Sequence, residues 1–90
     1  MQNLYSDSVY QRIQEYGIIP LVTLENARDA LLLGQALMEC GLPIVEITFR
    51  TKAAEEAIKI LKKEYPEILV GAGTVLTKAT AKIAIQAGAE

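Results

Sequence analysis

The sequence contains no histidine and no tryptophan, and its only cysteine is Cys40. One cysteine cannot form an intrachain disulfide, and the cysteine spacing typical of a metal site is absent. Cysteine nucleophiles need a neighbouring group that favours the thiolate, and there is no histidine to supply one. Cys40 directly precedes Gly41 at a predicted helix end, so we expect it to be a small packed thiol.

Long apolar runs and an excess of positive charge are also absent. No apolar run approaches the eighteen or so residues of a membrane span. Residues 1–7 lack the basic and apolar segments of a signal peptide, so we expect a cytoplasmic protein. The formal charge of −2, with mixed signs, gives no basic surface for nucleic acid. The apolar share of 51% is typical of a globular domain, although a chain this short buries only roughly 60 to 65% of its unfolded surface.

One unit of a strand followed by a helix recurs along the chain. Strand-forming runs begin near Ile18, Pro43 and Ile68, and each is followed by a segment whose apolar residues have helical spacing. A short helix over residues 6–16 precedes the first unit. The repetition predicts an α/β fold with parallel strands and right-handed helical crossovers. Three strands alone leave two edges open and one face uncovered, so we infer that residues 1–90 are a piece of a larger repeating α/β protein.

Local signals predict where these elements begin and end. Residues that can cap a helix follow each strand: Asn26, Thr51 and Thr77. Glycines are predicted at three helix ends: Gly17, Gly41 and Gly88. Pro20 cannot donate to a strand ladder, so we expect an irregularity in the first strand.

The second strand, Pro43–Thr51, contains a carboxylate in its interior. With a period of two, Glu46 and Arg50 share one face, and Val45, Ile47 and Phe49 share the other. A glutamate within a β-branched run loses much of its hydration, which disfavours its charged form and suits a general acid or base. The same pattern fits an exposed edge strand with its polar face in water. From this stretch alone the two interpretations have equal weight.

Polar residues also lie where the strands end, which is the ligand-binding edge of α/β sheets and βα barrels. The planar guanidinium of Arg50 suits a carboxylate or phosphate, although it could instead pair with a neighbouring loop. Thr74 offers one hydroxyl, yet an ordinary strand threonine is equally consistent with the pattern. Gly71 and Gly73 give room for a substrate, or relief where barrel strands crowd. They do not form a dinucleotide loop, because Leu76 replaces the third glycine.

Three segments in this order resemble one family: Ile-Pro-Leu-Val from Ile19, Val-Glu-Ile-Thr-Phe-Arg-Thr from Val45, and Val-Gly-Ala-Gly-Thr-Val-Leu from Val70. They are similar to the amino-terminal half of the 2-keto-3-deoxy-6-phosphogluconate (KDPG) and 4-hydroxy-2-oxoglutarate (KHG) aldolases. The resemblance covers residues 17–90. It implies a partial TIM (βα)8 barrel in a homotrimer that uses a Schiff-base lysine, with no metal or other cofactor, to cleave a keto acid to pyruvate and an aldehyde.

The resemblance also implies roles for particular residues. Glu46 matches the proton-transferring glutamate of the family, and Arg50 and Thr74 match residues that hold the pyruvyl carboxylate. Thr51 matches the loop threonine beside that arginine.

The Schiff-base lysine of the family lies on a later strand, and so does its phosphate site. The lysines of this chain all fall in predicted outer helices or their first turns: Lys52, Lys59, Lys62, Lys63, Lys78 and Lys82. A solvated lysine stays protonated near neutral pH and is a poor nucleophile. We therefore expect the chain alone to be inactive as an aldolase. The alternative hypothesis is a non-catalytic half-barrel that pairs its open edges with another copy.

Overall fold

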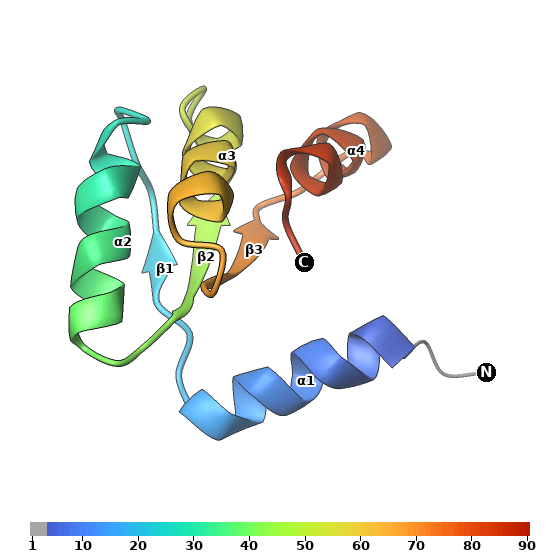
Figure 1. The fold of residues 1–90 in the computed structure, drawn as a ribbon. Coiled ribbons are helices and arrows are strands. Elements are labelled where there is room, and N and C mark those ends of the chain that lie inside the picture. The colour runs from blue at the N-terminus through green and yellow to red at the C-terminus, as the bar shows by residue number, and fades with distance from the viewer. Residues whose placement is uncertain (1–3) are drawn as a thin grey trace.

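The computed structural model describes residues 4–90, with side chains from Val9 onward. Its elements are α1 (Leu4–Tyr16), β1 (Leu21–Val22), α2 (Asp29–Glu39), β2 (Ile44–Thr48), α3 (Ala54–Glu64), β3 (Leu69–Gly73) and α4 (Lys78–Ala87). The strands form one parallel sheet in the order β1-β2-β3 (Figure 1). A helix, three parallel strands and their crossover helices were predicted in this order, and the structure confirms that arrangement.

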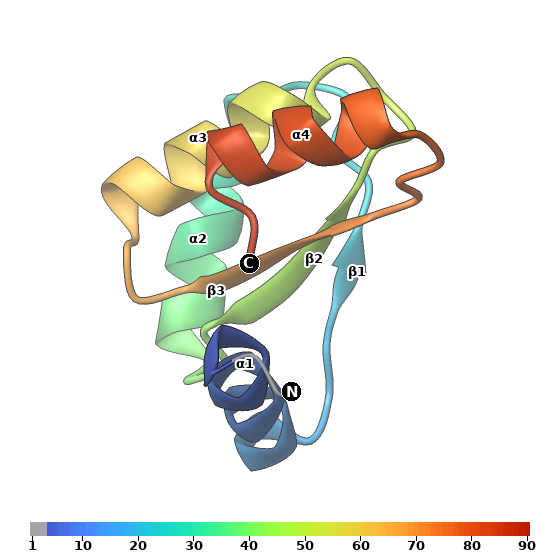
Figure 2. The same ribbon diagram turned by 90° about the vertical axis from the view of Figure 1, so that its right-hand side faces the viewer.

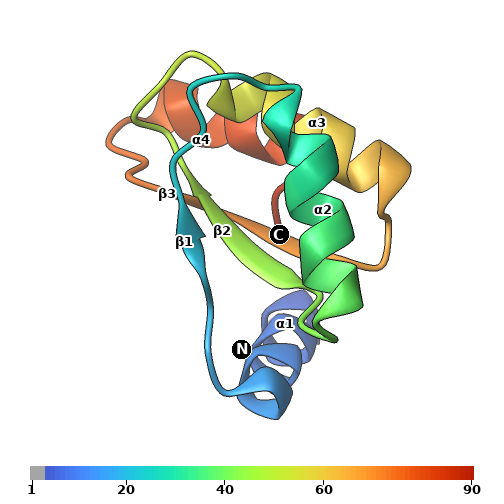
Figure 3. The same cartoon turned by 90° about the vertical axis from the view of Figure 1, so that its left-hand side faces the viewer.

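Helices α2, α3 and α4 lie on one side of the sheet. α3 and α4 lie above it in Figure 2, and the view from the opposite side shows α2 beside α3 (Figure 3). Val45, Ile47 and Val70 point to this side and are buried together with Ile58 and Leu61 of α3. A fully buried side chain of this size contributes about 1.5 to 3 kcal/mol. The period-two apolar face of β2 therefore forms the core with the amphipathic α3.

The other side of the sheet is covered only where the strands begin. Ile44 and Leu69 are almost fully buried there. They line a small cavity of about 190 Å³ together with Val9 and Ile13 of α1. The position of α1 below the sheet agrees with this contact (Figure 2). This face is therefore closed at the amino-terminal ends of the strands.

Four of the predicted helix signals are confirmed. The Thr77 hydroxyl accepts a hydrogen bond from the Thr80 amide at 3.0 Å, and Gly88 ends α4 with a φ of 118°. Gly17 and Gly41 also have positive φ, as expected for glycines that end helices.

Other local predictions are wrong. α3 begins after Ala53 without a side-chain cap, because the Thr51 hydroxyl donates instead to the carbonyl of Leu24. Asn26 accepts from the Arg28 amide at 3.0 Å, one turn before α2 begins. Cys40, expected to be packed, is exposed.

The strands are shorter than the apolar runs. β1 begins only after Pro20, whose carbonyl accepts a hydrogen bond from the Glu46 amide at 2.9 Å. β2 ends at Thr48, and β3 ends at Gly73. Arg50, Thr51 and Thr74 therefore lie in the connections that follow the strands.

Two further features are absent from the described residues. None of their helices combines the length and hydropathy needed to cross a bilayer. They also contain no cluster of three or more side chains suited to holding a metal ion.

Candidate functional site

Glu46 lies at the middle of the central strand, on the face opposite the helices. Its strand neighbours in register are Leu21 of β1 and Gly71 of β3. The side chain is half-buried, and the carboxylate lies over Gly73, in the space where a larger side chain would begin. For the part of the chain that the structure describes, no hydrogen bond or ion pair of this carboxylate is recorded. The Glu46 side chain therefore extends along the face of the sheet opposite the helices, toward the carboxyl ends of the strands.

Two threonine hydroxyls meet one step further along the same face. Thr48 is the last residue of β2, is only 6% exposed, and lies next to Gly73 in the sheet register. Its hydroxyl is 2.7 Å from that of Thr23, which follows β1. This contact joins β1 to β2 where the ladder of β1 has already ended.

Arg50 and Thr74 follow strand ends that are hydrogen-bonded to each other. The Phe49 amide donates to the Gly73 carbonyl at 2.8 Å. Arg50 comes directly after Phe49, and Thr74 comes directly after Gly73. Arg50 is exposed, and no ion pair with another described residue is recorded for it. A donor fork of this kind remains available to an anionic ligand.

The backbone of Thr74 has a φ of 56°, in the left-handed region. Such a conformation is unfavourable for a β-branched residue and costs of order 1 to 3 kcal/mol. The sequence pattern had favoured a continued strand here, so the sharp turn at Thr74 is a feature that periodicity missed. Backbone strain of this kind is concentrated at functional sites.

Thr51 is committed to a structural contact within the chain. Its hydroxyl donates to the Leu24 carbonyl, which joins the loop after β2 to the loop after β1. This bond holds the segment containing Arg50. Thr51 can therefore act on a ligand through the position of that loop.

None of the lysines lies on a strand. Lys52 precedes α3, while the others belong to α3 or α4. Lys62 is the most engaged of them, with its ammonium group 3.0 Å from the Ile68 carbonyl and 2.7 Å from the Glu90 carboxylate. Lys62 thus fixes the end of the chain against α3, at the opposite end of the sheet from Arg50.

Solved structures of aldolases have the same arrangement. A 2-keto-3-deoxy-6-phosphogluconate aldolase of Zymomonas mobilis ZM4, solved with 3-phosphoglycerate, matches 91% of this chain and 39% of its own, with a TM-score of 0.82 and 39% identity. A KDPG aldolase of Legionella pneumophila, with pyruvate captured as a covalent carbinolamine intermediate, matches 79% of this chain and 34% of its own, with a TM-score of 0.74 and 38% identity. The three strands and their helices therefore correspond to consecutive units of the TIM-barrel fold of these aldolases.

Sequence comparisons identify the particular family. The 2-dehydro-3-deoxy-phosphogluconate aldolase of Haemophilus influenzae is 39% identical over 94% of this chain and 40% of its own length. The corresponding enzyme of Treponema pallidum is 42% identical over 92% of this chain and 40% of its own length. The family model of KDPG and KHG aldolases matches residues 9–90, and the chain belongs to this family. It spans about 40% of the length of these two relatives.

Proposed function

We propose that these residues form the amino-terminal part of the active site of an aldolase that cleaves KDPG or KHG to pyruvate and an aldehyde. One observation supports this most directly: the Glu46 carboxylate points toward the carboxyl ends of β2 and β3. Arg50 and Thr74 lie there, each directly after one of two residues that are hydrogen-bonded to each other. Membership of the family supplies the reaction class.

Each residue has a separate task in this proposal. Arg50 and the Thr74 hydroxyl bind the carboxylate of the keto acid, and Thr51 holds the loop of Arg50. Glu46 transfers protons: it protonates the departing hydroxyl of the carbinolamine and accepts a proton when the carbon–carbon bond breaks to give the aldehyde. A half-buried carboxylate without a recorded protein partner is suited to both steps.

The nucleophile is the missing group. A Schiff-base mechanism needs an unprotonated lysine near the keto carbon, and the lysines of this chain belong to helices and to the turn before α3. We propose that the lysine and the phosphate site lie in the part that the relatives have and this chain does not cover. In the complete enzyme, the resemblance favours a homotrimer.

Complementation tests the proposal. This chain is mixed with a polypeptide that supplies the remaining strands of a family member, and pyruvate release is measured. We expect cleavage only when both parts are present. Glu46→Gln should lower kcat by about 10² to 10⁴-fold, since that is the usual contribution of a general acid or base. Full activity of Glu46→Gln would contradict the catalytic assignment.

Borohydride trapping tests the predicted inactivity of the chain alone. The chain is incubated with pyruvate and sodium borohydride, and its mass is measured. We expect no adduct, because solvated ammonium groups do not attack the keto carbon. A stable pyruvyl adduct on any of the six lysines would overturn this part of the proposal.

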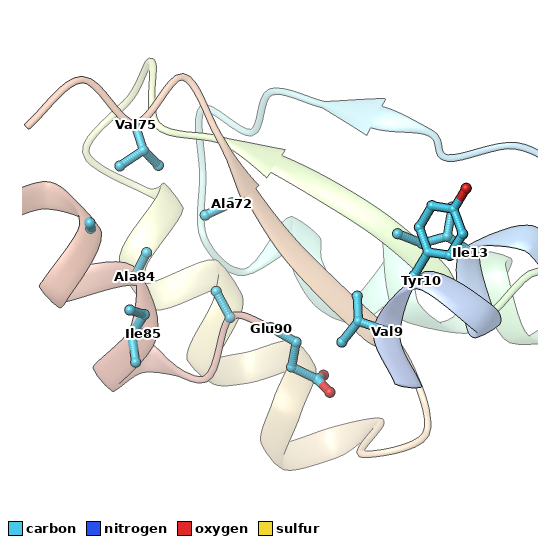
Figure 4. Close-up of a pocket in the computed structure, with 10 residues that line it drawn as sticks. Val9, Tyr10, Ile13, Ala72, Val75, Ala84, Ile85 and Glu90 are labelled. Carbon is cyan, nitrogen blue, oxygen red and sulfur yellow. The ribbon is translucent and has the colours of Figure 1, made fainter. Parts of the chain in front are cut away.

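A second function, self-association of a half-barrel, is favoured by an apolar hollow beside β3. The hollow has a volume of about 850 Å³ and lies between α1, β3 and α4. Figure 4 shows its lining residues, among them Val9, Tyr10, Ile13, Val75 and Ile85. Ile85 is 69% exposed and Tyr10 is 62% exposed, so apolar surface is available to another copy. Sedimentation velocity tests this, because a monodisperse monomer at high concentration would argue against self-association.

A further inference from the structure

The two glycines of β3 face Glu46 in different ways. Gly71 is the register neighbour of Glu46, and a Cβ atom built there meets only the Val45 carbonyl, at 4.0 Å. A Cβ atom built on Gly73 lies 2.9 Å from Cδ and 3.2 Å from Cγ of Glu46, and closer still to its Oε2. The Glu46 side chain therefore does not lie over Gly71, its register neighbour. It extends toward the carboxyl ends of the strands and lies over Gly73, the next residue on the same face of β3.

Backbone conformation does not explain the glycine at this position. The glycines with positive φ are Gly17, Gly41 and Gly88, so the φ of Gly73 is one that alanine can also adopt. What a side chain at position 73 would remove is space, and the Glu46 carboxylate occupies that space. The sequence had suggested room for a substrate or relief of crowded strands, and the structure offers a third explanation.

We propose that Gly73 is a positioning residue, whose missing side chain determines where the Glu46 carboxylate lies relative to Arg50 and Thr74. The inference rests on the proposed function, because it assigns to Gly73 the placement of the proton-transferring group. Gly73 does not touch the substrate in this proposal. It acts through Glu46 alone.

A positioning role and a structural role of Gly73 predict different effects of substitution on the stability of the fold. The atoms that a Cβ at position 73 would meet belong to the far end of a flexible side chain, which can rotate away. Gly73→Ala should therefore leave the urea midpoint of unfolding nearly unchanged while it displaces the carboxylate. Gly71→Ala is the matched control, since it adds the same methyl group to the same strand where the nearest atom is 4.0 Å away.

Kinetics of the complemented enzyme provide the first test. Gly73→Ala should lower kcat by about 100-fold, as expected for a reacting group displaced by roughly 1 Å, with KM changed less than about threefold. Gly71→Ala should keep both parameters within about threefold. Because Gly73 acts through Glu46, Gly73→Ala should cause no further loss in a Glu46→Gln background. Equal losses for the two glycine variants, or additive losses with Glu46→Gln, would overturn the inference.

The outcome for Glu46→Gln distinguishes the two proposals. If this variant is fully active, the proposed function fails. If it is inactive while Gly73→Ala is fully active, only the positioning role fails.

Nuclear Overhauser contacts provide a second test that needs no catalysis. In the 90-residue chain, the Cγ protons of Glu46 should show a contact with the Cα protons of Gly73 that is lost in Gly73→Ala and retained in Gly71→Ala. The absence of this contact in the unsubstituted chain would overturn the inference.

Discussion

Two glycines that end helices have positive φ but different surroundings. Gly41 has a φ of 67° and nothing within 4 Å of the position of a Cβ atom. Gly88 has a φ of 118°, and a Cβ atom there would lie 2.8 Å from Cγ and 3.3 Å from Cβ of Lys62. Lys62 cannot move freely, because its ammonium group binds the Ile68 carbonyl and Glu90. Gly88 therefore combines a more strained backbone conformation with a steric conflict, and Gly41 has neither.

Alanine substitutions at these glycines should differ in cost. Gly41→Ala should lower the free energy of unfolding by about 1 kcal/mol, the cost of a left-handed conformation for a residue with a Cβ. Gly88→Ala should cost about 2 kcal/mol or more, because a φ of 118° lies outside the left-handed region of L residues and Lys62 must also shift. Urea unfolding followed by circular dichroism measures both. Equal costs would contradict the expectation that Gly88 is the more constrained of the two.

The residues of the candidate site were only partly predictable from sequence. Period-two alternation separated Glu46 from Val45 and Ile47, and the structure has them on opposite faces, because alternation follows directly from strand geometry. The slant of Glu46 toward Gly73 could not be predicted, since it depends on a neighbouring strand. The positive φ of Thr74 was missed for a similar reason: local propensity favours extended threonine, and only the surrounding structure imposes the turn.

The helices show the same division between local and distant causes. Thr77 and Gly88 were predicted correctly, because each acts on backbone groups within its own turn. Thr51 was predicted to cap α3, yet its hydroxyl binds Leu24, which is 27 residues away. β1 was predicted as a longer run, and Pro20 precedes the two residues that pair. Contacts between elements therefore decided the features that local patterns could not.

Because α3 is buried against the sheet, a conservative substitution in its core-facing side should cost more stability than the same substitution at an exposed position of α4. Ile58→Val should lower the free energy of unfolding by about 0.5 to 1.5 kcal/mol, because Ile58 is fully buried and the lost methyl group leaves a cavity. Ile85→Val in α4 is the matched control. Ile85 is 69% exposed, so the change should stay within about 0.5 kcal/mol. Similar costs at both positions, measured by urea unfolding, would contradict the assigned burial.

At the scale of the whole molecule, α1 is attached by a polar contact as well as by apolar packing. The Arg12 guanidinium donates to the Glu67 carbonyl at 2.9 Å and lies 3.8 Å from the Glu90 carboxylate. The hydrogen bond is exposed and the ion pair is partly exposed, so each contributes about 1 kcal/mol. Arg12 thus joins α1 to the segments before β3 and after α4.

Arg12→Ala should loosen α1 without unfolding the sheet. We expect amide hydrogen exchange in α1 to accelerate by about tenfold, while the amides of β2 keep their protection. Gln11→Ala, an exposed neighbour on the same helix, should leave both unchanged. Equal acceleration in β2 would mean that the loss of Arg12 destabilises the entire fold.

The position of α1 determines how the effects of substitutions at the two ends of the sheet combine. α1 packs where the strands begin, whereas the loops that follow the strands are joined to one another through contacts such as Thr51 to Leu24. The recorded polar contacts of Arg12 go to Glu67 and Glu90, away from those loops. Substitutions at the two ends should therefore have additive free energies. A stabilising change beneath the sheet could then compensate for destabilising mutations in the candidate site at its opposite rim.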